Sequence, residues 1–134
     1  MTKNVAIQKC EEYDFEAVFQ SLRRMAELVP PPDVSGKTVL LKPNILSPKK
    51  PEHAVCTHPV VVGAAVKLFK ELGAARVIVG ESPATANPVA AAKSTGMYKQ
   101  VTENGGEWVD FSGGVSVPCE QGKIVKVLEF ANAF

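Results

Sequence analysis

The stretch "THPVVVGAAVKLFKELGAARVIVGES", residues 57–82, decides the fold, because it combines a helix with a buried strand that follows it directly. Proline suits the first turn of a helix, and glycine suits the left-handed position just beyond a helix end. The helix is therefore predicted from about Pro59 to Leu72, with Gly73 as the residue that ends it. Its buried face is predicted from apolar residues at helical spacing, namely Val62, Ala65, Val66, Phe69 and Leu72.

Two predicted strands flank this helix. Ala75–Ser82 is a continuous apolar run until its last residues, as expected for a strand that is buried on both faces. Thr38–Lys42 is a second apolar run and precedes the helix. Strand, helix and strand in this order form a parallel unit with a right-handed crossover.

Further predicted elements extend the pattern in both directions. Asn4–Cys10 alternates as a short strand, and a helix then begins at its N-cap Asp14 and ends at the triple proline Pro30–Pro32. On the other side the predicted elements are a helix from Asn87 to Gly96, a short helix Tyr98–Glu103, a strand Glu107–Phe111, and a hairpin of residues 114–119 and 123–130 that turns at Glu120–Gly122.

These elements predict a single α/β domain over residues 1–134. The expected architecture is a Rossmann-like, three-layer α/β/α fold, with a mainly parallel sheet of about four strands and a C-terminal β-hairpin. The last residues, Ala131–Phe134, are apolar and lead toward a further element. We therefore expect the chain to be the N-terminal fragment of a longer protein.

Composition narrows the possible partners and the location. The formal net charge is +1, and the basic residues are scattered among acidic ones, which argues against nucleic acid or an anionic membrane as a partner. No apolar run approaches the ~20 residues that a membrane span needs, and the N-terminus lacks the apolar core of a signal peptide. Cys10, Cys56 and Cys119 are odd in number and widely spaced, which favours a reducing, cytoplasmic location.

Polar residues gather where the two central strands are predicted to end. Lys42 and Asn44 follow the first strand, and Glu81 and Ser82 close the second; Thr57 and His58 open the helix between them. In a parallel sheet, ligands bind outside the carboxyl ends of the strands, and a helix N-terminus favours anions. These six residues, called the rim below, predict a site for a small anionic ligand.

Each rim residue has an expected role. His58 is the candidate proton carrier, because an unperturbed imidazole has a pKa near ~6.5, and Lys42 would hold negative charge; both are the candidate catalytic residues. Asn44, Thr57, Glu81 and Ser82 are the candidate ligand-binding residues. A structural explanation stays open for all six, since Asn and Ser are common in turns and Thr or His can cap helices.

Other kinds of site receive less support. His53, Cys56 and His58 are three possible metal ligands in one loop, but zinc needs a fourth ligand or a water, so no metal site is predicted. Cys56 is more simply a small residue that packs near the helix start. A phosphate-binding Walker loop is also excluded, because Gly122-Lys123 is followed by Ile and lacks the preceding glycine.

Four short motifs carry a resemblance to a known family: Lys42-Pro43-Asn44, Thr57-His58-Pro59, Leu72-Gly73-Ala74 and Gly80-Glu81-Ser82-Pro83. In order and spacing, the chain from about Val5 to Val127 resembles the N-terminal half of the family named domain of unknown function 362. The resemblance implies a longer protein with a second α/β half, and often Cys-x-x-Cys-x-x-Cys segments that bind [4Fe–4S] clusters. This chain has no such segment, and the resemblance brings no established reaction.

Two hypotheses for function follow from the residues and the resemblance. The first is the N-terminal α/β domain of an iron–sulfur-associated redox protein, whose rim receives a small anionic ligand; no cofactor is expected in this chain, and any [4Fe–4S] cluster would lie in the missing C-terminal part. The alternative is a non-catalytic module that docks the missing C-terminal domain, or self-associates, through the apolar end Phe130–Phe134.

Overall fold

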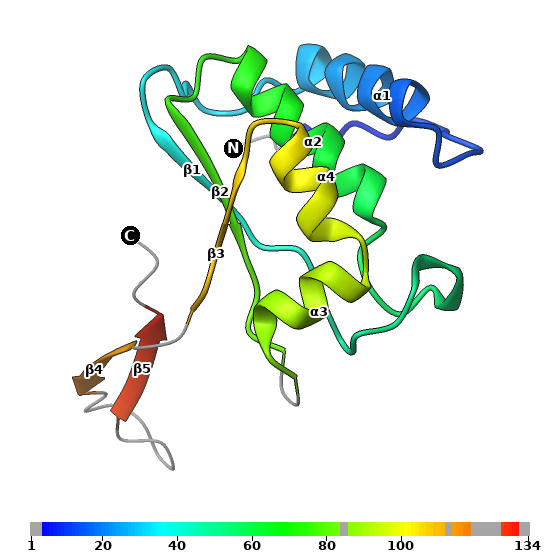
Figure 1. The fold of residues 1–134 in the computed structure, drawn as a ribbon. Coiled ribbons are helices and arrows are strands. Elements are labelled where there is room, and N and C mark those ends of the chain that lie inside the picture. Colours follow the sequence, from blue (N-terminus) through cyan, green and yellow to red (C-terminus); the bar gives the residue numbers. More distant parts are fainter. Residues whose placement is uncertain (1–3, 84–85, 112–113, 119–126, 132–134) are drawn as a thin grey trace.

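The fold is α/β, as predicted (Figure 1). The computed structural model describes residues 4–83, 86–111, 114–118 and 127–131. A parallel three-stranded sheet has the order β1-β2-β3, and its strands are β1 (Thr38–Leu41), β2 (Arg76–Gly80) and β3 (Glu107–Val109). The helices are α1 (Phe15–Leu28), α2 (Pro59–Glu71), α3 (Pro88–Ser94) and α4 (Met97–Glu103), with a short 3₁₀ helix, η1 (Pro51–His53).

The predicted helices are confirmed. They could be predicted because the residues that mark their ends act within a few positions along the chain. Asp14 caps α1 by accepting a hydrogen bond from the Ala17 N–H at 2.9 Å. Asn87 caps α3 through the Ala90 N–H at 3.0 Å. Gly73 follows α2 with a φ of 90°, a left-handed conformation that glycine adopts without steric cost.

The register of the sheet brings two strand ends together. β1 and β2 pair in parallel from Thr38 opposite Arg76 to Leu41 opposite Val79. β2 and β3 pair in parallel as well. All three residues at the centre of β2, Val77–Val79, are at most 2% exposed, which confirms the prediction of a strand buried on both faces.

Helix α2 packs between α1 and the rest of the core. On one side it joins the core with α3, α4 and the strands, through the buried residues Val62, Val66, Val77, Val79, Ala91, Ala92, Met97 and Val101. On another side Ala64 and Leu68 of α2 pack against Val18 and Phe19 of α1. The N-terminus of α2, which carries two rim residues, is therefore anchored from both directions.

Two details of the predicted sheet differ from the structure. Asn4–Cys10 forms no strand, and Val5 and Ile7 are 81% and 91% exposed. The main sheet consequently has three strands instead of about four, because an alternating pattern gives strand propensity but pairing also needs a neighbouring edge. The three-layer arrangement is not confirmed, since the described helices lie to one side of the sheet (Figure 1).

The predicted C-terminal hairpin is confirmed as a separate antiparallel pair. β4 (Gly114–Pro118) and β5 (Val127–Ala131) pair from Gly114 opposite Ala131 to Pro118 opposite Val127. The predicted turn, Glu120–Gly122, lies outside the described residues.

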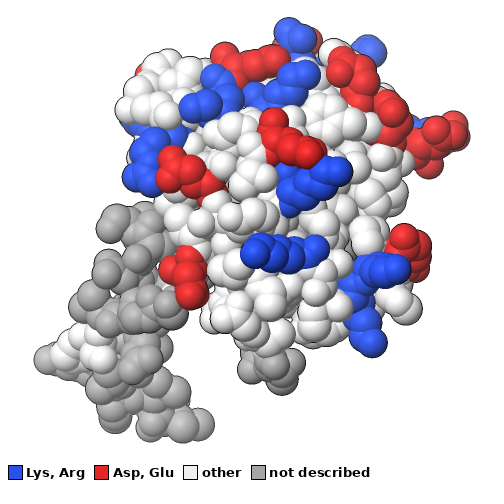
Figure 2. Space-filling model, viewed as in Figure 1, with Lys and Arg blue, Asp and Glu red and all other residues white. Residues whose placement is uncertain are grey.

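The charged side chains on the face shown in Figure 2 are of both signs and are interspersed. Acidic and basic groups also pair with one another, as in the ion pair between Arg76 and Glu107, 2.7 Å apart. None of the helices in the described part of the chain is both long enough and apolar enough to cross a membrane.

Candidate functional site

The structure brings Lys42 and Glu81 into direct contact at the carboxyl edge of the sheet. Each residue follows directly on the end of one of two neighbouring parallel strands, β1 and β2. The Lys42 Nζ lies 2.6 Å from the Glu81 Oε2. The sequence predicted this proximity from strand order alone, while the roles of both residues stay predictions.

The two partners differ in exposure. The Glu81 side chain is 7% exposed, whereas the Lys42 side chain is 60% exposed. The second carboxylate oxygen of Glu81 accepts a hydrogen bond from the Ser82 N–H at 2.8 Å. A buried carboxylate is costly unless it is paired and hydrogen-bonded, and here both oxygens have a donor. Glu81 is thus held in place, while the ammonium faces water.

Asn44 and Thr57 hold the long loop closed. The Asn44 N–H donates to the Thr57 Oγ1 at 2.9 Å, and the Thr57 N–H donates to the Asn44 carbonyl at 2.9 Å. The Asn44 side-chain amide also donates to the Val55 carbonyl at 3.3 Å. These bonds occupy groups that the sequence assigned to ligand binding, and they position Lys42 beside the start of α2.

His58 is the N-cap of α2. Its Nδ1 accepts a hydrogen bond from the Val60 N–H at 3.4 Å, so the ring proton of the neutral imidazole lies on Nε2. The phenol ring of Tyr13 stacks on the imidazole. Partial burial lowers the pKa of His58 below its ordinary 6.5, and the negative charge of Glu52 opposes this shift. The neutral form of His58 is therefore favoured at pH 7, and its Nδ1 is used by the cap.

Tyr13 is the site residue that sequence reasoning missed. It lies in the segment before α1, far along the chain from the rim, and only the tertiary packing of α1 against α2 brings it to His58. An aromatic residue next to a helix N-cap is a common local pattern, so no signal in the sequence distinguished it.

The backbone amides at the start of α2 are already used. Pro59 has no N–H, the Val60 N–H donates to the His58 ring, and the Val61 N–H donates to the His58 carbonyl at 3.0 Å. None of these three residues has a free amide for an anion, so the expected preference of this helix start for anions rests on the helix dipole. An anion at the rim would depend on Lys42 and on the helix dipole.

A groove of about 180 Å³ opens beside Lys42. Its lining is apolar apart from two rim residues, and consists of Leu41, Lys42, Pro43, Thr57, Val61, Val62 and Ala65. The groove follows the end of β1, which is an edge strand of the sheet.

Within the described residues, no three His, Cys, Asp or Glu side chains gather as a metal-binding group. Cys56 instead donates from its Sγ to the Ser47 carbonyl at 3.2 Å, and Ile45 and Cys56 form an isolated antiparallel bridge. His53 lies in the 3₁₀ helix η1 of the same loop.

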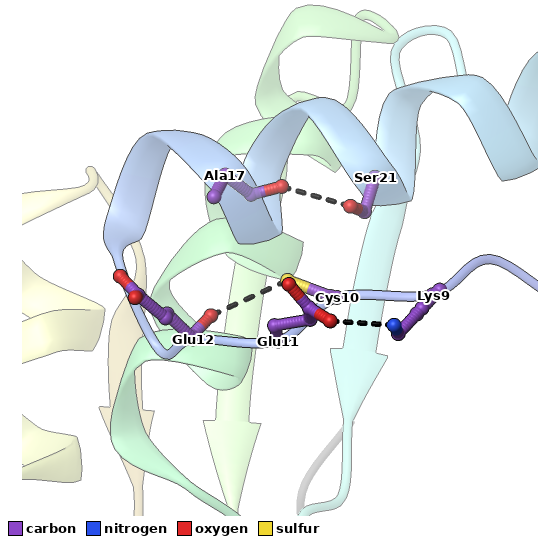
Figure 3. A pocket seen from close by; sticks show the side chains of 6 residues that line it. All are labelled: Lys9, Cys10, Glu11, Glu12, Ala17 and Ser21. Atoms are coloured by element: carbon purple, nitrogen blue, oxygen red, sulfur yellow. Dashed lines mark hydrogen bonds and ion pairs between the residues drawn. The ribbon is translucent and has the colours of Figure 1, made fainter.

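Larger hollows lie away from the rim, between α1 and the segment that precedes it. One, of about 380 Å³, is lined by Lys9, Cys10, Glu11, Glu12, Ala17 and Ser21 (Figure 3). Its polar groups bond to one another: Cys10 Sγ donates to the Glu12 carbonyl and Ser21 Oγ donates to the Ala17 carbonyl. A neighbouring hollow of about 450 Å³ reaches Leu22, Met25 and Val61.

Comparisons with known proteins give one family and one curated relative. The family model described as "Domain of unknown function (DUF362)" matches residues 39–134. A thylakoid-associated protein of Synechocystis is 31% identical over 121 residues, which cover 85% of this chain and 36% of the relative. The chain thus spans little more than a third of the length of that relative. No solved structure matches the chain.

Proposed function

Because the chain belongs to the DUF362 family, whose function is unknown, we propose that it is the N-terminal α/β domain of an iron–sulfur-associated redox protein with a rim that binds a small anionic ligand. The Lys42–Glu81 pair is the observation that carries the anion-binding part of this proposal. An ammonium group has three donors, and only one is needed for the 2.6 Å contact with Glu81. The other donors of an exposed Lys42 are available to a carboxylate or phosphate.

Glu81 gives the rim its geometry. The fixed, buried carboxylate of Glu81 holds the Lys42 ammonium at the sheet edge. Lys42 therefore has fewer conformations to lose when a ligand binds, which lowers the entropic cost of binding. Ser82 is exposed at the same strand end and can donate its hydroxyl to the ligand. Asn44 and Thr57 act by closing the loop.

His58 is the proton acceptor of the proposed site. Its neutral state at pH 7 follows from burial, which lowers its pKa, and its Nε2 carries the ring proton. The imidazole can accept a proton only at Nδ1, and this would break the hydrogen bond that Nδ1 accepts from the Val60 N–H. Proton uptake would therefore loosen the start of α2.

The iron–sulfur part of the proposal concerns the complete protein. The chain spans 36% of its curated relative, and we propose that a second α/β half and any [4Fe–4S] cluster lie in the remaining length of the complete protein. Iron and sulfide analysis of the anaerobically purified complete protein tests this part. Absence of both would contradict the redox assignment and leave anion binding at the rim to be tested separately.

Anion binding is tested by NMR titration of the complete protein with acetate and with inorganic phosphate. We expect saturable shifts in the resonances of Lys42 and its neighbours, and their loss in Lys42→Met. Lys49→Met is the matched control, because Lys49 is an exposed lysine in the same loop. Equal shifts in both variants, or none in the unaltered protein, would exclude the rim as an anion site.

The proposed location is the cytoplasm, from the odd number and wide spacing of the cysteines. Fractionation of cells that produce the complete protein would test this. Recovery in the membrane fraction would contradict it and would resemble the thylakoid association of the Synechocystis relative.

The alternative is a non-catalytic docking module, and the β4–β5 hairpin favours it. An isolated two-stranded sheet is marginal in water, so this hairpin has reason to pair with another surface. Sedimentation of the complete protein and of Phe130→Ser tests this alternative. Self-association that Phe130→Ser abolishes would support docking through the hairpin, and a monomer in both would contradict self-association through it.

A further inference from the structure

The groove of about 180 Å³ beside Lys42 lies at the same edge of the sheet as the rim. It runs between the end of β1 and the beginning of α2, and its lining consists of Leu41, Lys42, Pro43, Thr57, Val61, Val62 and Ala65. Lys42 and Thr57 therefore belong both to the rim and to the groove. A ligand held by Lys42 is consequently next to an apolar surface.

The apolar wall of the groove is formed by side chains that the core holds in place. Val62 is 5% exposed and belongs to the main core, and Leu41 packs against that core. Val61 and Ala65 are half-buried and leave part of their surface to the groove. The groove is therefore preformed, as is usual for small-molecule sites.

Among the described residues that line the groove, Lys42 and Thr57 alone have polar side chains. The Thr57 Oγ1 already accepts a hydrogen bond from the Asn44 N–H at 2.9 Å. The Lys42 ammonium has donors beyond the one that bonds to Glu81. The groove thus combines an apolar wall with one cationic group, and this combination is complementary to an anion that carries an apolar chain.

The neighbouring carboxylate of Glu81 favours a ligand with a single negative charge. The Glu81 Oε2 lies 2.6 Å from the Lys42 Nζ, so an anion on this ammonium also meets the charge of Glu81, and the net attraction of the pair is small. That attraction grows in proportion to the charge of the ligand, whereas the cost of removing the ligand from water grows with the square of its charge. A carboxylate therefore suits this position better than a doubly charged phosphate.

The volume of the groove limits the length of the apolar chain. An enclosed apolar cavity of about 150 Å³ holds one benzene molecule. The groove has a volume of about 180 Å³ but is open to water, and it accordingly holds a chain of about four to six carbon atoms. Drug-sized ligands need about 300–1,000 Å³ and are too large for it.

We propose that the rim and the groove together bind a short aliphatic monocarboxylate, with its carboxylate on Lys42 and its chain along Val61, Val62 and Ala65. This inference rests on the proposed anion site at the rim and names the class of ligand for that site. Lys42 attracts the charge of the ligand, and the groove selects its apolar part.

Titration of the complete protein with acetate, butyrate and hexanoate tests this inference. NMR shifts at Lys42 and at the methyl groups of Val61 and Ala65 give a dissociation constant for each. A methylene group that leaves water completely raises the affinity about fourfold. Because the groove is open to water, we expect about twofold to fourfold for each methylene, so that hexanoate binds at least about tenfold more tightly than acetate. Hexanol has a chain of similar length and no charge, and binding as tight as that of hexanoate would overturn the proposal.

Two variants locate the chain of the ligand. Ala65→Leu fills the groove and should abolish the preference for hexanoate over acetate, whereas Ala90→Leu, at an exposed alanine of α3 outside the groove, should keep it. Val61→Thr preserves the shape of the side chain but adds a hydroxyl, so it should lower the affinity for hexanoate about threefold or more even where Ala65→Leu disturbs the packing of α2. An unchanged affinity for hexanoate in both groove variants would place the chain elsewhere and overturn the proposal.

Failure of the groove and failure of the rim give different results. If acetate shifts the resonances around Lys42 but hexanoate binds no more tightly, the anion site stands and the proposed ligand class is overturned. The same result is expected where another part of the complete protein fills the groove. If none of the three carboxylates binds, the anion site itself fails, and this proposal fails with it.

Discussion

The phenol ring of Tyr13 lies flat against the imidazole of His58, with ring centroids 3.7 Å apart and planes at 11°. The contact joins the starts of α1 and α2, and it shields one face of the imidazole from water. The same imidazole caps α2 through its Nδ1. One ring thus both stacks and caps, and the cap requires an unprotonated Nδ1.

Stability should depend on pH through His58. Burial lowers the pKa of His58 in the folded chain below the 6.5 of the unfolded chain, so the unfolded chain binds the proton first as the pH falls. The stabilisation is fully present above about pH 6.5 and is lost as the pH falls through the folded pKa. We expect the free energy of unfolding, measured in urea, to decrease between about pH 7.5 and pH 5.5. His58→Asn should remove this decrease, because Asn caps helices but does not titrate; His53→Asn should retain it, and a decrease that survives in His58→Asn would refute the assignment.

Removing the stacked ring should raise the pKa of His58 toward 6.5. Tyr13→Ala exposes the imidazole to water and so reduces the desolvation that disfavours its charged form. An NMR titration of the His58 ring protons measures this directly. Tyr13→Phe is the matched control, since it keeps the ring and should leave the pKa unchanged; an unchanged pKa in Tyr13→Ala would show that other groups bury His58.

The pair at the rim should couple more strongly than the pair at the opposite end of the sheet. Glu81 is buried with Lys42 as its partner, whereas Arg76 and Glu107 are both exposed. A double-mutant cycle with Lys42→Met and Glu81→Gln should give a coupling free energy of about 1–2 kcal/mol, limited by the exposure of the ammonium. The same cycle with Arg76→Met and Glu107→Gln should give a smaller value. Equal coupling free energies for the two pairs would mean that burial of Glu81 does not strengthen its interaction with Lys42.

Gly80 should not tolerate a methyl group. A Cβ at this position would lie 2.5 Å from the Phe111 Cε1 and 2.9 Å from the Val109 Cγ2. Gly80→Ala should therefore lower the free energy of unfolding by about 1–3 kcal/mol, the usual cost of overpacking. Phe111→Leu in the same chain should recover part of this loss, measured against Phe111→Leu alone. No recovery would place the strain at Val109 or in the backbone of β2.

Much of the fold could be predicted because its signals are local. Asp14, Pro59, Gly73 and Asn87 each mark a helix end within a few residues, and each occupies the expected position. The failure at Asn4–Cys10 has a different origin: strand propensity is local, but pairing depends on an edge that the sequence does not reveal.

The candidate site also contains some contacts that could be predicted from the sequence and others that could not. The contact of Lys42 with Glu81 could be predicted, because parallel neighbouring strands end at one edge. The stack of Tyr13 on His58 could not, since it depends on how α1 packs against α2. Nor could the sequence reveal the hydrogen bond between Asn44 and Thr57, because Asn and Thr are common both in turns and in ligand-binding sites.

The occupied amides at the start of α2 decide how the rim can choose among anions. A helix start with free N–H groups imposes directions on its ligand, whereas an ammonium on a flexible stem is a compact charge that accepts carboxylate, phosphate or sulfate in many poses. If the rim binds an anion as proposed, Lys42 is the principal cation there, and it would attract negative charge while doing little to recognise the shape of the ligand. On that proposal, affinity and specificity would reside in different parts of the protein.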